Sequence, residues 1–134
     1  MSWDVMVLRS ENLPPDLGNP PEDWMPDEMG EAELVRSKIS QALPGVDWSD
    51  PAWGRFEGEG FSIEFNFQES GAVNAFTLHI RGWGDPLPAI VGLCRPHGWA
   101  AFDYSDGSRI NLDNPSRENW AAFQAYRDKV TGQR

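Results

Sequence analysis

Strict alternation of apolar and polar residues from Phe61 to Phe67 constrains the fold of this chain more than any other feature. Apolar side chains take every second position, so in a β-strand they all lie on one face and the polar ones on the other. Glycine-bearing turns stand on both sides of the segment. Residues 53–57 and 73–81 are therefore predicted to pair with 61–67 as antiparallel strands.

The other elements are predicted from periodicity and from the placement of proline and glycine. Strands are expected at 3–9, 99–104 and 109–112, and helices at 31–43, from Asp85–Pro86 to His97, and after Asn114–Pro115, the last with Trp120, Phe123, Arg127 and Val130 on its inner face. The resulting order, β-α-β-β-β-α-β-β-α, predicts a single α+β domain over residues 1–134. It combines a mostly antiparallel sheet of five to six strands with three helices on one face. The helical connection between 73–81 and 99–104 allows one parallel pair.

A proline-rich segment at 10–30 interrupts this pattern. Its five prolines exclude a helix or a central strand, so a long loop is expected. Charge is concentrated around it, because residues 1–70 hold fifteen acids and four bases while residues 71–134 hold six acids and seven bases. Eight of the acids and no base lie between Ser10 and Val35. Such a cluster repels itself, which favours either a solvated loop or a surface that attracts a basic partner.

Tryptophans beside acids indicate how such a partner could be held. Trp24 and Trp48, two of seven tryptophans, lie in loop contexts next to Asp23 and Asp47. Tryptophan is enriched among the residues that dominate binding energy, and surrounding acids steer a basic partner. The alternative is that each indole caps the edge of the core, which is the commoner use of a single tryptophan. The predicted partner-binding residues are Glu22, Asp23, Trp24, Asp27, Glu28, Asp47, Trp48 and Asp50.

The polar face of the predicted central strands is a second candidate surface. A four-residue turn at 69–72 aligns the apolar faces and sets this register: Phe65 opposite Phe76, Ile63 opposite Leu78, Phe61 opposite Ile80, Ser62 opposite His79, and Arg55 opposite Glu64. Arg55, Glu64, His79 and Arg81 then share a patch with Ser62, an alternative site for an enzyme or ligand-binding domain. Cross-strand charge pairs ordinarily stabilise a sheet, however, and a mid-strand serine has no free amides for an oxyanion hole. No catalytic residue is therefore predicted.

Other chemistry is not indicated by the sequence. Gly82-Trp83-Gly84 lacks the third glycine of a nucleotide-binding loop, and Asp85 would repel a phosphate, so a tight turn before a helix is expected. His79, His97 and Cys94 lack the spacing of a zinc site, so no metal or cofactor is expected. The net charge of −10 argues against nucleic acid and anionic membranes as partners. Without a signal-peptide pattern or a membrane-length apolar run, we expect a cytoplasmic protein.

Three segments carry a resemblance to known proteins: Met1–Leu8 (MSWDVMVL), Trp48–Gly54 (WSDPAWG) and Glu57–Asn66 (EGEGFSIEFN). They are similar to a family of small stand-alone bacterial proteins. In size, acidity and α+β character the chain also resembles immunity proteins of bacterial toxin systems, a resemblance that implies no catalytic residues. The hypothesis is therefore a non-enzymatic protein-binding domain, an immunity-type inhibitor of a basic toxin domain. A subunit of a larger complex that uses the same surface remains an alternative.

Overall fold

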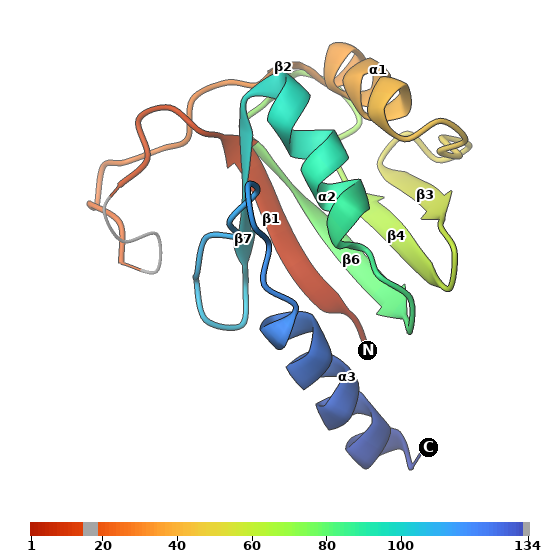
Figure 1. Ribbon diagram of the computed structural model, residues 1–134. Helices are drawn as coiled ribbons and strands as arrows, with labels where there is room; N and C mark the ends of the chain where they lie inside the picture. The colour runs from red at the N-terminus through yellow and green to blue at the C-terminus, as the bar shows by residue number, and fades with distance from the viewer. Residues whose placement is uncertain (15–18, 133–134) are drawn as a thin grey trace.

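A five-stranded antiparallel sheet forms the centre of the protein. The computed structural model describes residues 1–14 and 19–132, and within them the sheet order is β3-β4-β6-β1-β7. Every neighbouring pair is antiparallel, and β1, the first strand of the chain, lies between β6 and β7 (Figure 1). The strands span Trp3–Arg9 (β1), Trp53–Glu57 (β3), Phe61–Asn66 (β4), Ala75–Gly82 (β6) and Trp99–Asp103 (β7).

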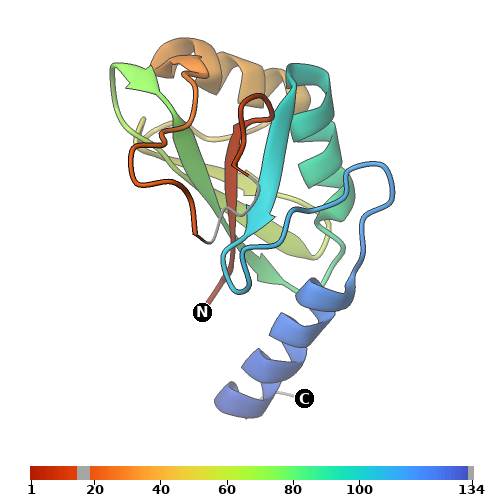
Figure 2. The ribbon, with the colours of Figure 1, turned by 90° about the vertical axis from the view of Figure 1, so that its left-hand side faces the viewer.

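Helices α1 (Ala32–Ala42) and α2 (Leu87–Cys94) cover one face of this sheet (Figure 1). The apolar residues of α1 recur every four positions, so Val35 and Ile39 share one side and are fully buried. They join the inward side chains of the strands, such as Ile63 and Leu78, in one core. These layers and the antiparallel sheet confirm the predicted α+β class. The third helix, α3 (Glu118–Thr131), lies at the end of the sheet (Figure 2).

Two short strands explain why the predicted register was wrong. β2 (Gly30–Glu31) pairs with β5 (Ala72–Val73), so residues after β4 leave the main sheet before β6 begins. The pairing of β5 with β2 makes the connection between β4 and β6 longer than a four-residue turn. The register of β4 against β6 is therefore shifted by two positions from the predicted one. Ile63 lies opposite Ile80 and Phe65 opposite Leu78. A shift of two keeps every side chain on its predicted face, because the period of a strand is two.

Three further expectations need correction. β6 and β7 run in the same direction, but β1 separates them, so they form no parallel pair. Residues 109–112 do not form a strand, since Arg109 makes only an isolated bridge to Phe102. Helix α3 begins at Glu118, after Asn114–Pro115, and extends past the end of the sheet (Figures 1 and 2), which leaves Val130 54% exposed.

Both outer edges of the sheet are partly covered by irregular chain. On β3, the backbone of Arg55 exchanges two hydrogen bonds with Asp47, at 2.8 and 3.0 Å. On β7, the Ile110 amide donates to the carbonyl of Ala101 and the Asp103 amide donates to Ser108. The exposed ladder of an edge strand is therefore short on each side.

Candidate functional site

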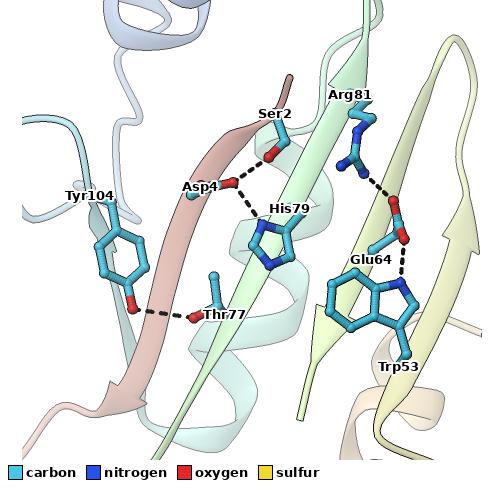
Figure 3. Close-up of polar contacts among 8 residues, drawn as sticks. All are labelled: Ser2, Asp4, Trp53, Glu64, Thr77, His79, Arg81 and Tyr104. Carbon is cyan, nitrogen blue, oxygen red and sulfur yellow. Dashed lines mark hydrogen bonds and ion pairs between the residues drawn. The ribbon is translucent and has the colours of Figure 1, made fainter.

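Glu64 is the centre of a hydrogen-bonded group on the open face of the sheet, the face opposite α1 and α2. Its two carboxylate oxygens accept hydrogen bonds from the indole Nε1 of Trp53 and from the guanidinium of Arg81 (Figure 3). The Glu64 side chain is 19% exposed, against 41% for Arg81. The three residues come from three adjacent strands, so this group ties β3, β4 and β6 together through side chains.

His79 forms a second group beside the first. It lies directly opposite Glu64 in the register, and its Nδ1 is 2.8 Å from Oδ1 of Asp4 on β1 (Figure 3). The imidazole stacks on the indole of Trp53, with ring centroids 5.4 Å apart and an interplanar angle of 20°. The Ser2 hydroxyl donates to the same oxygen of Asp4. Side chains from four strands thus form one continuous polar layer.

The predicted polar patch is therefore assembled only in part. Arg55 lies opposite Glu64 as expected, but Glu64 pairs with Arg81, and no ion pair of Arg55 is present in the described parts of the chain. Ser62 lies opposite Arg81 rather than His79, because of the two-residue shift, so no Ser–His contact forms. Arg55 lines a hollow with Asp47, Phe56 and Glu57, and the lining of that hollow includes no other residue of the patch. The contacts of Glu64 with Trp53 and Arg81, and that of Asp4 with His79, join neighbouring strands, so this arrangement braces the sheet.

The proline-rich loop is docked on the same open face. Trp24 packs with Leu8 and Phe102 in a small apolar cluster, separate from the main core. Its indole Nε1 donates to the carbonyl of Asn12 at 2.9 Å, and its amide donates to Pro21. Trp24 is therefore the anchor of the loop on its own domain, in agreement with the core-edge interpretation of this residue.

Further contacts hold the acidic part of the loop in place. The side-chain amide of Asn12 donates to the carboxylate of Asp27 at 2.9 Å. The Arg9 guanidinium donates to the backbone carbonyl of Glu28, and the side chain of Asn74, between β5 and β6, donates to the backbone carbonyl of Pro26. The side chains of Glu22, Asp23 and Glu28 are exposed. Hydrogen bonds thus hold the loop on the domain while its acidic side chains remain exposed. Asp16, an acid of the same cluster, lies outside the described residues.

The remaining predicted partner-binding residues lie at the other edge of the sheet. Trp48 packs against Phe65 and Phe67, with ring centroids 5.9 and 5.8 Å apart, and its Nε1 donates to the Ser40 hydroxyl. Asp47 accepts hydrogen bonds from the hydroxyl and amide of Ser49, which lower the pKa of its carboxyl. Asp50 accepts a bond from the Ala52 amide. The structure does not bring this group together with the acids of the loop, because β3 and β7 are opposite edges.

The turn after β7 contains residues that the sequence analysis did not single out. Asp103 is 1% exposed, and each of its carboxylate oxygens accepts two hydrogen bonds. Oδ1 accepts from the amide and hydroxyl of Ser105, and Oδ2 accepts from Trp3 Nε1 at 2.9 Å and Asn119 at 2.7 Å. Asp103 therefore joins the end of β7 to the N-terminal strand and to α3. The available sequence signal was the repeated Asp-x-Ser pattern, which favours such turns.

Two other motifs have structural roles. The amides of Trp83 and Gly84 both donate to the carbonyl of Gly60 at 2.8 Å, so they close a turn against the β3–β4 hairpin, as the tight-turn interpretation expects. Burial raises the pKa of the Cys94 thiol to about 12. Within residues 1–14 and 19–132, no group of three or more His, Cys, Asp or Glu side chains is placed to hold a metal ion. Nor does any helix there have the length and apolar character needed to cross a membrane.

Comparisons of this chain with protein-family models, with curated proteins and with solved structures found no match. Its function is accordingly inferred from the geometry of its own surface.

Proposed function

We propose that this chain is a non-enzymatic protein-binding domain whose acidic loop attracts a basic partner. The most concrete form is an immunity-type inhibitor that covers a basic toxin or effector domain. A subunit of a larger complex with a basic neighbour would use the same surface.

The observation that carries the proposal is the docking of the acidic loop. Arg9 and Asn74 donate hydrogen bonds to its backbone carbonyls, and Asn12 donates to the side chain of Asp27. The side chains of Glu22 and Asp23 are exposed. Fixed charges of one sign raise the local concentration of an oppositely charged partner and speed association by about 10- to 1000-fold, an effect that salt weakens. A floppy acidic tail would attract a partner too, but it would lose more conformational entropy on binding.

The structure also changes which apolar residue could contact the partner. Trp24 and Trp48 pack on their own domain, whereas Met25, beside the exposed acids, is 71% exposed. Methionine is unbranched and adapts to irregular surfaces, which suits a contact within a charged surface. Met25 is therefore the apolar contact that the proposal assigns to the loop.

The test reverses the charge of acidic residues whose side chains make none of the contacts that hold the loop in place. The variant Glu22→Lys/Asp23→Lys/Glu28→Lys is compared with a matched control, Glu57→Lys/Glu59→Lys/Glu69→Lys, which changes the net charge equally at exposed sites elsewhere. A partner captured from cells of the source organism is purified, and association rates are measured by stopped flow at several salt concentrations.

We expect the loop variant to associate roughly tenfold more slowly at low salt, and with a weaker salt dependence, than the control variant. Equal slowing in both variants would mean that only net charge matters and would contradict a role for the loop. Unchanged association in both would contradict electrostatic recognition altogether.

A further inference from the structure

A hollow of about 490 Å³ lies at the end of the sheet, between the start of β1, the turn after β7 and helix α3. Figures 1 and 2 both place these three segments at the same end of the molecule. The residues that line it include Met1 and Asp4 and the aromatic residues Trp3, Tyr104, Phe123 and Tyr126. The two tyrosines are 53% and 60% exposed, so their rings are accessible to a ligand, and the Tyr104 hydroxyl lies 3.2 Å from the hydroxyl of Thr77.

One carboxylate among the lining residues, that of Asp4, has an oxygen atom without a hydrogen-bond partner in the described parts of the chain. Oδ1 of Asp4 accepts the hydrogen bonds of Ser2 and His79, whereas Oδ2 has no hydrogen-bond partner within the described parts of the chain. The other carboxylate in the wall, Asp103, is buried and has four donors. Among the described residues no Lys or Arg side chain lines the hollow, and Met1, with its α-amino group, is part of the lining. The lining therefore combines aromatic residues with a carboxylate oxygen of Asp4 that has no hydrogen-bond partner among the described residues.

We propose that this hollow receives an arginine or lysine side chain of the basic partner. The alkyl part of such a side chain fits against aromatic rings, a cation is attracted by the ring faces, and the charged end pairs with a carboxylate. The volume lies within the range of small-molecule sites, so one long side chain fits. The proposal rests on the proposed function for the source of the cation, and it names the position at which the partner is anchored.

The hollow and the acidic loop are connected by one strand. Asp4, Met6 and Leu8 alternate with the buried residues of β1, so they share the open face, and Trp24 covers Leu8 at the loop end. At about 3.3 Å per residue, Asp4 and Leu8 are separated by roughly 13 Å. A standard protein interface of about 800 Å² on each partner is roughly 28 Å across, about twice this span. A single partner can therefore contact both the loop and the hollow.

The test uses a small probe, so it does not depend on the natural partner. Nα-acetyl-arginine amide is titrated into the chain without an N-terminal tag, and the amide resonances of Ser2, Tyr104 and Tyr126 are followed by NMR. Nα-acetyl-citrulline amide has the same shape without the charge. Ala122→Trp fills the hollow from an exposed helical position, and Ala125→Trp, on the same helix but outside the lining, is its control.

We expect the arginine probe to bind with a Kd on the order of 1–10 mM, because a single side chain offers few atoms. Citrulline should bind roughly tenfold more weakly, Ala122→Trp should abolish binding, and Ala125→Trp should leave it unchanged. Asp4→Asn should weaken the arginine probe about fivefold and leave citrulline unaffected.

Equal binding of arginine and citrulline, or equal effects of Ala122→Trp and Ala125→Trp, would overturn the assignment. These results are independent of the loop variants. If the probe fails to bind but charge reversal in the loop slows partner association, the hollow is not the anchor and the proposed function stands. If the probe binds as expected and the loop variants associate normally, the proposed function fails and the cation site stands.

Discussion

Replacing Gly54 with alanine tests whether Trp48 belongs to the core. Gly54 is buried on β3, and a Cβ atom at this position would lie 2.5 Å from Cζ3 and 2.7 Å from Cη2 of the Trp48 indole. The ring has little room to retreat, because it packs between Phe65 and Phe67 and its Nε1 is bonded to Ser40.

Overpacking of this kind costs about 1–3 kcal/mol. Alanine is better than glycine inside a strand by about 0.5–1 kcal/mol, which offsets part of the cost. We therefore expect Gly54→Ala to lower the free energy of unfolding by about 1–2 kcal/mol. The matched control is Gly92→Ala on α2, where a Cβ would meet nothing within 4 Å, so this change should raise stability by about 0.5–1 kcal/mol.

The assay is urea unfolding followed by circular dichroism, in which Gly54→Ala should lower the midpoint by roughly 0.5–1 M. The same substitution is then made in a Trp48→Leu background, where its penalty should disappear because the clashing ring is gone. A penalty of equal size in both backgrounds, or no penalty in either, would refute the placement of Trp48 in the core.

Three further predictions concern single side chains. Cys94 should resist alkylation at pH 8 in the native protein and react once urea unfolds the chain. Burial raises the pKa of its thiol to about 12 in the folded protein, so the stability that the neutral thiol contributes should be lost as the pH rises above about 9. Hydrogen bonds from Ser108 lower the pKa of the Asp106 carboxyl, so the stability that the carboxylate contributes is present above the unfolded pKa of about 3.9 and is lost on further acidification. Unfolding curves between pH 6 and 2.5 should therefore show a weaker acid dependence for Asp106→Asn than for the wild type. Arg127→Met should destabilise the protein by about 1–3 kcal/mol in thermal or urea unfolding, because the carbonyl of Gly82 loses a donor at 2.7 Å; an unchanged midpoint would show that α3 is held by its other contacts.

Local patterns predicted the faces of the strands better than their pairing. The alternation from Phe61 to Phe67 correctly assigned Ile63 to the core and Glu64 to the open face. The register against β6 was missed because it depends on β5 leaving the sheet to pair with β2, a contact between residues about forty positions apart. No turn rule applied to residues 69–72 contains that information.

The candidate site shows the same limit. The acidity of the proline-rich loop could be predicted directly from its residues, and so could the position of Arg55 opposite Glu64 in the strand register. The hollow at the end of the sheet could not, because Asp4, Tyr104 and Tyr126 come together only when the strand order and the position of α3 are known. An exposed aromatic residue does not by itself indicate a binding site, because the residues that face it across a hollow are not known from the sequence.

The central position of β1 has a consequence for how the chain is made. Its partners are late in the sequence, since Trp3 pairs with Ile80 and Arg9 pairs with Trp99. During synthesis the first strand must wait until most of the chain has left the ribosome, and pairing over such separations makes folding slow for a domain of this size. A nascent chain that ends before Trp99 contains β6 but not β7, so the edge of β1 that pairs with β7 would be left exposed. Such chains are expected to need a chaperone, and truncated products should aggregate rather than accumulate as folded fragments.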